Sequence, residues 1–235
     1  MRHTARLFEM GLKQTTRDGM LLILIPAPFF VGLFFKLAVP LINAALIAGF
    51  SFSLTAWYGL IDAMLICLTP MFTAMLSAFL LLDERDAGLN AFYQISPVQG
   101  CSYLFARIGL PMLWAFVATL IVSSIFNISR LSFGAIFSSA LVSGLAGVCS
   151  AMMIVSFSGN RVEGLAFSKL MGISFMGVIL IWFIPAPYSF FLAFLPSFWV
   201  GKILLDGPAL TSLLGGVLSC CAWIALFTKK FLRRA

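Results

Sequence analysis

Charged residues are scarce in this sequence. Aspartate, glutamate, lysine and arginine make up 10% of the 235 residues, whereas 62% are hydrophobic. A water-soluble domain has about 25% charged and about 45–50% apolar residues, so it has nowhere to bury this much apolar surface. The mean hydropathy of +1.08 agrees with that comparison. The composition therefore excludes an ordinary soluble domain and predicts a protein that spans a membrane several times.

The sequence also lacks the motifs of common enzyme chemistries. It contains no GxxxxGK[ST], GxGxxG, HExxH or GxSxG pattern, which excludes a P-loop of its own and the usual nucleotide, zinc-protease and hydrolase signatures. Its one histidine, His3, precedes the apolar part of the chain, and we expect it to be solvated. We predict no catalytic residues, no metal site, no bound cofactor and no enzymatic activity for this chain.

Neither the cysteines nor the positive charge indicates another function. None of the five cysteines forms a CxxC pair, and four lie in apolar runs, where cysteine usually serves as a small packing residue. The net charge is +7, but the basic residues are scattered between apolar runs and form no continuous stripe. We therefore expect no nucleic-acid partner and assign the basic residues to the membrane surface.

Long apolar runs are what the sequence has in abundance. A helix needs about 20 apolar residues to cross about 30 Å of hydrocarbon. Six runs meet that length, at about 20–40, 58–82, 103–126, 133–157, 166–186 and 209–228. They predict an all-α membrane protein in which residues 20–235 form a single domain of six transmembrane helices.

Two further apolar stretches do not fit the pattern of full crossings. Residues 41–57 are too short to cross separately, and residues 187–208 are broken by Pro196 and by Gly207-Pro208. The aromatic side chains of both stretches suit a membrane interface. We interpret both as short interfacial or re-entrant pieces on the outer side.

The distribution of basic residues predicts the orientation in the membrane. With six crossings and a cytoplasmic N-terminus, twelve of the fifteen lysines and arginines fall on the inner side, as the positive-inside rule requires. The outer side has only Lys36, Arg130 and Lys202. Both termini are therefore expected in the cytoplasm.

The segment before the first run has a helical charge pattern. Residues 1–19 carry charges at positions 2, 6, 9, 13 and 17, a spacing that places them on one face of a helix. We interpret this segment as an amphipathic helix lying in the inner interface of the membrane. A frayed basic tail is the alternative.

An unusual short segment follows the second run. Four consecutive charges form what we call the charge quartet: Asp83, Glu84, Arg85 and Asp86. Beyond it, Leu89, Phe92 and Tyr93 have helical spacing, and Pro97 breaks the pattern. This arrangement fits either a solvated helix end or a short amphipathic helix that docks a cytosolic protein.

Two weaker signals lie inside the apolar runs. Asp62 is near the outer end of the second run, and we interpret it as a charge wetted by headgroup water in preference to part of a substrate path. Gly164, Ser168 and Gly172 recur at a spacing of four. Small residues at that spacing let helices approach closely, either within one chain or between two subunits.

The segment around the charge quartet resembles a known family. The sequence reads Glu84-Arg85-Asp86-Ala87-Gly88-Leu89, then Ser96-Pro97-Val98, then Tyr103-Leu104-Phe105-Ala106-Arg107. This order is similar to that of ABC-2-type transporter permeases. The run PMFTAMLSAFLLLDERD resembles the small fluoroquinolone-type export permeases in particular, and the late FLPSFWVGK is similar to a segment before the last span in the same class. With the six-run layout, the resemblance covers most of the chain.

The resemblance implies a fold, a location and partners. The fold would be that of an ABC-2 (type V) exporter in the plasma membrane of a bacterium, and the chain would be a half-size transmembrane subunit that pairs with a copy of itself or with a paralogue. A separate ATP-binding cassette ATPase would bind ATP and Mg²⁺ and drive export of a hydrophobic or amphipathic drug, peptide or lipid-like substrate. A membrane-embedded immunity or binding component that does not pump is the alternative.

In such permeases the segment after the second span couples the ATPase to transport. The resemblance therefore assigns residues 83–102 as a coupling loop. The residues assigned to it are Asp83, Glu84, Arg85, Asp86, Gly88, Leu89, Phe92, Tyr93 and Pro97. Gly164, Ser168 and Gly172 are assigned to helix packing or to a dimer interface.

Overall fold

The structure, a computed structural model, describes residues 15–16, 18–88 and 105–232. Within these ranges every regular element is helical, and six helical segments are long and apolar enough to cross a membrane. The prediction of an all-α membrane protein with six spanning helices is confirmed.

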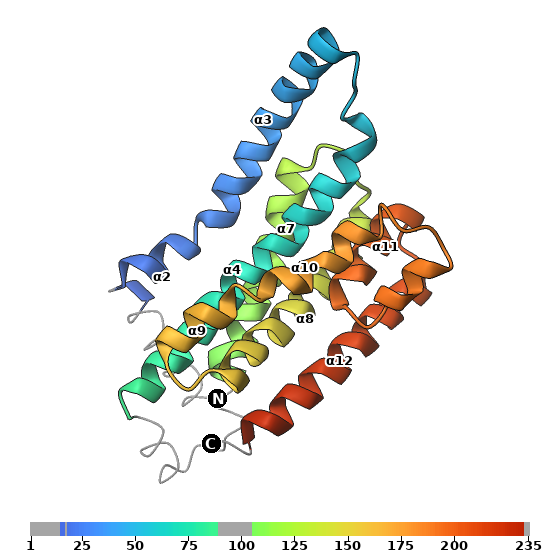
Figure 1. Ribbon diagram of the computed structural model, residues 1–235. Helices are drawn as coiled ribbons and strands as arrows, with labels where there is room; N and C mark the ends of the chain where they lie inside the picture. Colours follow the sequence, from blue (N-terminus) through green and yellow to red (C-terminus); the bar gives the residue numbers. More distant parts are fainter. Residues whose placement is uncertain (1–14, 17, 89–104, 233–235) are drawn as a thin grey trace.

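The crossings alternate in direction (Figure 1). They are made by α3 (Ala27–Phe50), α4 (Tyr58–Asp86), α7 (Leu110–Phe126), α8 (Phe133–Phe157), the pair α9 (Arg161–Ser168) and α10 (Met171–Leu180), and α12 (Leu210–Leu232). The shorter elements are α2 (Gly19–Leu24), α11 (Pro196–Asp206), the 3-10 turns η1 (Thr55–Trp57) and η3 (Tyr188–Leu192), and the π-helical turn η2 (Phe105–Gly109). The start of α2 and the end of α12 lie at the same end of the bundle.

Local sequence signals set several helix starts. The Asn160 side chain accepts a hydrogen bond from the Glu163 backbone N–H at 2.8 Å, and the Glu163 carboxylate accepts one from the Gly159 N–H at 2.5 Å. These two bonds satisfy donors at the start of α9 that the helix itself leaves unused. Proline occupies the first turn of α7 and of α11, where its missing N–H costs nothing.

The centre of the bundle is formed by α4 and α8. Phe79 and Leu82 of α4 and Ile154 of α8 are fully buried. The two helices approach closely at Gly147, where an added Cβ would lie 3.1 Å from the Pro70 Cβ and carbonyl oxygen. Because α7, α10, α11 and α12 pack around this pair, most of α4 has no contact with lipid.

The first crossing differs from the predicted span of 20–40. A turn at Ile25 and Pro26 separates α2 from α3, and α3 then continues without interruption to Phe50. Residues 41–50 are therefore part of this helix and not a separate interfacial piece, because no residue between Pro40 and Ser51 stops it. Only Pro28, Gly32 and Val39 of α3 are buried, and Figure 1 shows its far end projecting beyond the other helices.

The second stretch interpreted as interfacial or re-entrant, 187–208, contains η3 and α11. α11 does not lie loosely on the surface. Its Phe198, Val200 and Ile203 side chains are fully buried, and it packs against α8, α10 and α12. This short helix therefore contributes to the core near one end of the bundle.

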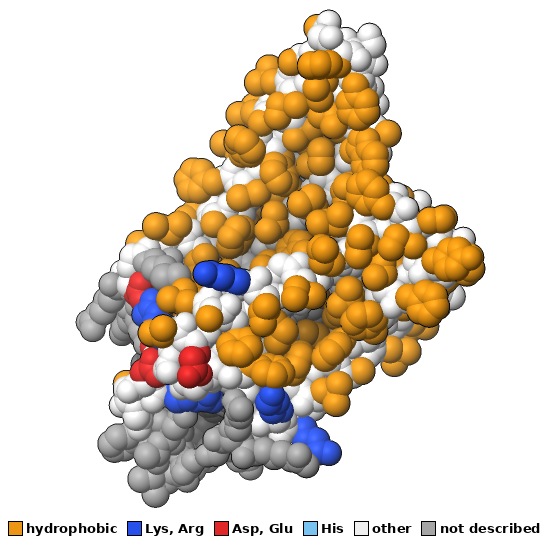
Figure 2. Space-filling view, in the orientation of Figure 1, with side chains coloured by type: hydrophobic (Ala, Val, Ile, Leu, Met, Phe, Trp, Pro, Cys, Tyr) orange, Lys and Arg blue, Asp and Glu red, His pale blue; other side chains and the backbone are white. Residues whose placement is uncertain are grey.

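Among the described residues, most charges lie near the two ends of the bundle; Lys169, in the turn between α9 and α10, is an exception. In Figure 2 the acidic and basic side chains gather at the lower end, below a broad apolar surface. We call this end, which contains the charge quartet, the charged end; the end that contains Asp62 is the opposite end. The 21 helical steps from Asp62 to Asp83 of α4 rise about 30 Å at about 1.5 Å per residue. This distance matches the hydrocarbon thickness of a bilayer.

Candidate functional site

The charge quartet lies in the last turn of α4 and not in the segment after it. The helix ends at Asp86, and Gly88 adopts a left-handed conformation with φ 71°. Helical structure continues through the quartet because no residue before Gly88 breaks it. Consecutive helical residues point about 100° apart, so the four side chains are directed toward different neighbours.

Glu84 forms a buried ion pair with Arg107. Arg107 lies in η2, immediately before α7, and its guanidinium contacts the Glu84 carboxylate. The side chains are only 3% and 2% exposed. The interpretation of the quartet as a merely solvated helix end is therefore wrong for Glu84. Each charge of a buried pair depends on the other, because either one alone would be costly to bury.

Arg85 contacts the end of α8. Its Nη1 donates to the carbonyl oxygens of Ser158 at 2.7 Å and Val155 at 3.4 Å. The last carbonyls of a helix have no intrahelical partner and carry partial negative charge. A guanidinium at this position satisfies them and attaches α8 to α4.

Asp83 and Asp86 both contact Arg161, the first residue of α9. The Arg161 Nη1 lies 3.1 Å from both Asp83 carboxylate oxygens, and its backbone N–H donates to Asp86 at 3.0 Å. The Nη2 of Arg161 also lies 2.6 Å from Asp18, just before α2. One arginine therefore joins three segments.

Together these contacts form what we call the quartet network. It attaches α4 to the start of α7, the end of α8, the start of α9 and the residue before α2. Sequence reasoning did not pair the quartet with its partners Asp18, Arg107 and Arg161. A signal was present: three acids and one base give the quartet a net charge of −2, which requires basic partners if the helix end is buried.

Part of the predicted coupling loop lies outside the described residues. Gly88 is the last described residue after α4, and the chain resumes at Phe105 beside Arg107. Leu89, Phe92, Tyr93 and Pro97 fall between them. The predicted amphipathic helix over 1–19 likewise falls mostly outside the described ranges.

The predicted row of small residues does not form one face. The turn at Lys169 and Leu170 separates α9 from α10, so Gly164 and Gly172 lie on different helices. Gly164 is buried against α4, where an added Cβ would lie 2.4 Å from a Leu82 methyl carbon, whereas a Cβ added at Gly172 would meet no neighbouring element within 4 Å. Ser168 donates to the Leu165 carbonyl oxygen at 2.8 Å within α9. Gly164 therefore serves packing within the chain, and Gly172 lies on an open surface.

Asp62 is buried at the opposite end. Its side chain is 2% exposed. The interpretation of Asp62 as a charge wetted by headgroup water is therefore wrong. The carboxylate accepts hydrogen bonds from the Ile128 N–H at 3.0 Å and the Ser129 N–H at 2.8 Å, and also from the Ser129 hydroxyl. Asp62 therefore holds the turn between α7 and α8.

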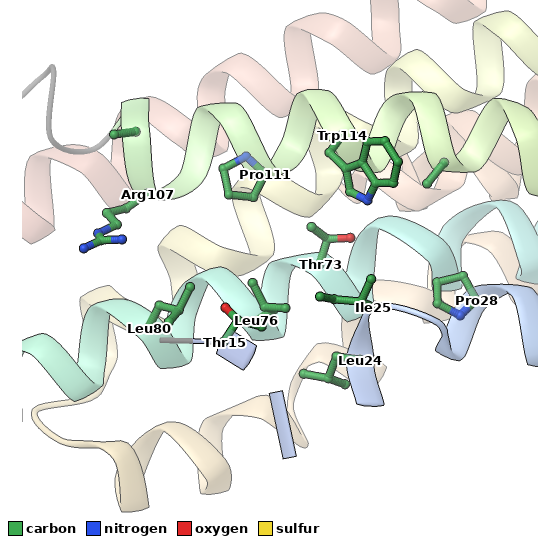
Figure 3. Close-up of a pocket in the computed structure, with 12 residues that line it drawn as sticks. Thr15, Leu24, Ile25, Pro28, Thr73, Leu76, Leu80, Arg107, Pro111 and Trp114 are labelled. Carbon is green, nitrogen blue, oxygen red and sulfur yellow. The ribbon is translucent and has the colours of Figure 1, made fainter. Parts of the chain in front are cut away.

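A cavity lies next to the quartet network. It has a volume of about 370 Å³ and is bounded by α2, the start of α3, α4 and α7. Figure 3 shows Pro111 and Trp114 of α7 on one side and Thr73, Leu76 and Leu80 of α4 on the other. Arg107 lies at the charged end of the cavity, so one guanidinium belongs both to the network and to the cavity wall.

These features define a class of protein. Six apolar crossings, charges mostly near the ends and a cavity between the crossings define a multi-pass membrane protein and are compatible with a permease. The family described as "Fluoroquinolones export permease protein Rv2686c-like" matches residues 11–228, and the chain belongs to this family. The resemblance to the small fluoroquinolone-type export permeases is thereby confirmed.

Two curated relatives come from Mycobacterium tuberculosis. They are named "Fluoroquinolones export permease protein Rv2686c", from strain ATCC 25618 / H37Rv, and "Fluoroquinolones export permease protein MT2760", from strain CDC 1551 / Oshkosh. The chain is 29% identical to each over 197 residues, which cover 81% of this chain and 77% of the relative. No solved structure matches the chain.

Proposed function

We propose that this chain is the transmembrane subunit of an ATP-driven exporter. ATP and Mg²⁺ bind to a separate ATP-binding cassette ATPase, and this chain forms the path of the substrate. The names of the two relatives support export, and the lack of a P-loop in this sequence supports a separate ATPase chain. The substrate is a hydrophobic or amphipathic small molecule, with fluoroquinolones the first class to test because the relatives bear that name.

The quartet network is the observation that carries the proposal. We call the part of the coupling loop that follows the quartet the docking segment. It begins directly after α4, and the described chain resumes at Phe105, two residues before Arg107. A force on this segment therefore acts first on α4 and on the turn before α7. The ion pairs and carbonyl contacts of the quartet pass it on to α8, α9 and α2. Closure of an ATPase dimer would thus move several crossings together.

The charged end faces the cytoplasm in this proposal. Support comes from the twelve basic residues assigned to that side. In a cysteine-free background, Arg130→Cys at the opposite end should react with an impermeant thiol reagent in intact cells, and Val162→Cys at the charged end should not. Both positions are exposed. The reverse labelling pattern would refute this orientation.

We also propose that two permease subunits pair, as copies of this chain or as paralogues. Fourteen residues of α3 follow Lys36, which donates to the Ile125 carbonyl oxygen at the end of α7. They extend about 20 Å past that contact, and Leu37 and Leu41 are 59% and 71% exposed. A second subunit covers this apolar length, and the open surface at Gly172 is a second candidate contact. Gly172→Leu should weaken pairing in crosslinking assays, whereas Ala166→Leu, an exposed position on α9, should not.

The test of ATP-driven export uses the permease with an ATP-binding cassette ATPase of the same organism. Cells that contain both should expel a fluoroquinolone, and replacement of the P-loop lysine of the ATPase should abolish that export.

Phe92→Ala and Tyr93→Ala in the assigned docking segment should reduce co-purification of the ATPase. Lys229→Ala, an exposed charge at the end of α12, is the control; Arg161→Ala is unsuitable because Arg161 belongs to the quartet network. Binding of the drug without ATP-dependent export would favour a binding or immunity component instead.

A further inference from the structure

We propose that the cavity between α2–α3, α4 and α7 is a binding site for a compact aromatic carboxylate. The apolar body of this ligand packs against α4 and α7, and its carboxylate points toward Arg107. The inference rests on the proposed function, because it locates the site at which an export substrate is first held within one subunit.

The size of the cavity suits a small molecule. Its volume of about 370 Å³ lies within the range of about 300–1,000 Å³ that is usual for ligand pockets. Along η2 and α7 the lining extends from Arg107 to Ala118, eleven helical steps that span about 16 Å. A compact ligand fits this length, which covers about half of the hydrocarbon thickness.

The lining is mostly apolar along its length, with the Thr73 hydroxyl near the middle, and is charged at one end. Leu76, Leu80 and Pro111 form the walls, and Trp114 offers an aromatic face for stacking (Figure 3). Arg107 and Thr15 lie at the charged end. A ligand with an apolar ring system and one acidic group at its edge matches this division.

The cavity is reached from the lipid side. Its floor is buried, since Leu80 is 4% and Ala106 is 1% exposed. At its rim, Ile25 is 39% and Trp114 is 53% exposed. These rim residues belong to the part of the bundle between the charged end and the middle of the membrane. An amphipathic molecule dissolved in that leaflet therefore has lateral access to the site.

Occupancy of the site is linked to the quartet network through Arg107. A ligand carboxylate near the guanidinium competes with Glu84 for the same positive charge. The Glu84–Arg107 contact joins α4 to the start of α7, so its weakening would loosen the connection between these two crossings. Binding in the cavity would thus change the contact between the two residues that flank the docking segment, Glu84 and Arg107.

The experiment measures binding to the permease alone, without an ATPase. The purified chain is placed in phosphatidylcholine nanodiscs and titrated with ciprofloxacin, a fluoroquinolone carboxylate whose own fluorescence anisotropy reports binding. Thr73→Phe fills the cavity, and Ser150→Phe is the matched control because Ser150 is a half-buried hydroxyl residue that lines a separate cavity of about 270 Å³. We expect Thr73→Phe to weaken binding by at least about tenfold, which corresponds to about 1.4 kcal/mol, and Ser150→Phe to leave it unchanged.

The role of Arg107 is tested with a double variant that keeps the ion pair balanced. Glu84→Gln combined with Arg107→Gln removes both charges and leaves hydrogen-bonding groups in their place. This variant should lose affinity for ciprofloxacin but retain affinity for its decarboxylated analogue. Equal loss for both compounds would overturn the assignment of the carboxylate to Arg107.

The remaining outcomes decide between occupants and sites. A lipid such as phosphatidylglycerol also combines an apolar body with an anionic group. Retention of this lipid by the wild type in native mass spectrometry, its loss in Thr73→Phe and the absence of ciprofloxacin binding would overturn the proposed occupant. Ciprofloxacin binding that Thr73→Phe does not weaken would overturn the site. Neither result bears on ATP-driven export, which is measured separately in cells with the ATPase.

Discussion

The two ends of α4 hold their buried carboxylates in different ways. At the opposite end, Asp62 accepts hydrogen bonds from the N–H groups of Ile128 and Ser129 and from the Ser129 hydroxyl, all in one turn. At the charged end, Glu84 pairs with the guanidinium of Arg107, and Asp83 with that of Arg161. Neutral donors from a single turn compensate the first carboxylate, whereas opposite charges from separate segments compensate the others.

This difference separates a fixed connection from an adjustable one. The N–H donors around Asp62 belong to the backbone of the turn that they hold, so they cannot exchange partners without unfolding that turn. The charges of the quartet network lie on side chains from α4, η2 and α9, which can exchange partners when those segments shift. We infer that the opposite end acts as an anchor and that conformational change is concentrated at the charged end.

The largest effect is expected from breaking the buried ion pair. Glu84→Ala leaves the Arg107 guanidinium buried without its carboxylate partner, and loss of one member of such a pair costs about 3–5 kcal/mol. Thermal unfolding of the purified permease, followed by size-exclusion chromatography, should show a strongly lowered midpoint.

A double variant checks this explanation. Glu84→Gln with Arg107→Gln removes both charges and should recover most of the lost stability. If Glu84→Ala alone is as stable as the wild type, the pair does not hold α4 to α7, and the contrast between the two ends fails.

Asp62→Ala should have the next largest effect. It removes the acceptor from the backbone N–H groups of Ile128 and Ser129, and an unsatisfied donor of this kind costs about 1–3 kcal/mol. Asp62→Asn keeps a carbonyl acceptor and should be milder. The same unfolding assay applies, and hydrogen exchange should show increased exposure limited to the turn between α7 and α8. Increased exchange that reaches the charged end would contradict an anchor role.

Arg161→Ala should lower the unfolding midpoint less than Asp62→Ala does. It should, however, increase local opening at the start of α9. The side chains of Arg161, Asp18 and Asp83 are 29%, 25% and 18% exposed, and ion pairs that water reaches contribute about 0–1 kcal/mol each. We expect a small fall in the unfolding midpoint relative to the wild type. This difference should become smaller at high salt, because salt screens the ion pairs. Hydrogen exchange at the start of α9 should nevertheless rise. Unchanged exchange there would show that Arg161 does not join the segments.

The smallest change is expected for Lys36→Met at the opposite end. The Lys36 ammonium donates to the exposed Ile125 carbonyl oxygen at 2.5 Å, and one such hydrogen bond contributes about 0.5–1.5 kcal/mol. Since water or headgroups can replace the donor, the low end of that range applies. A midpoint shift as large as that of Asp62→Ala would show that Lys36 contributes more to the stability of the opposite end than its one hydrogen bond indicates.

The sequence predicted the class of fold well because hydrocarbon thickness constrains helix length directly. It did not predict where α3 ends. Apolar residues such as those in 41–50 do not indicate whether the helix stops at the end of the bundle or continues past the other helices. It identified the charge quartet but not Arg107 or Arg161 as partners. Helix order and packing bring these residues together over separations of 23 and 78 positions, which no local pattern records.

The Glu84–Arg107 pair also has a consequence for how the chain is made. The two residues are 23 positions apart, so at about 5–20 residues per second the guanidinium leaves the ribosome about one to five seconds after the carboxylate. A carboxylate is costly to bury before its counter-charge arrives. The final burial of Glu84 therefore has to wait for Arg107, and α4 and α7 reach their places as a hairpin. A single ion pair thus sets an order of events during membrane insertion.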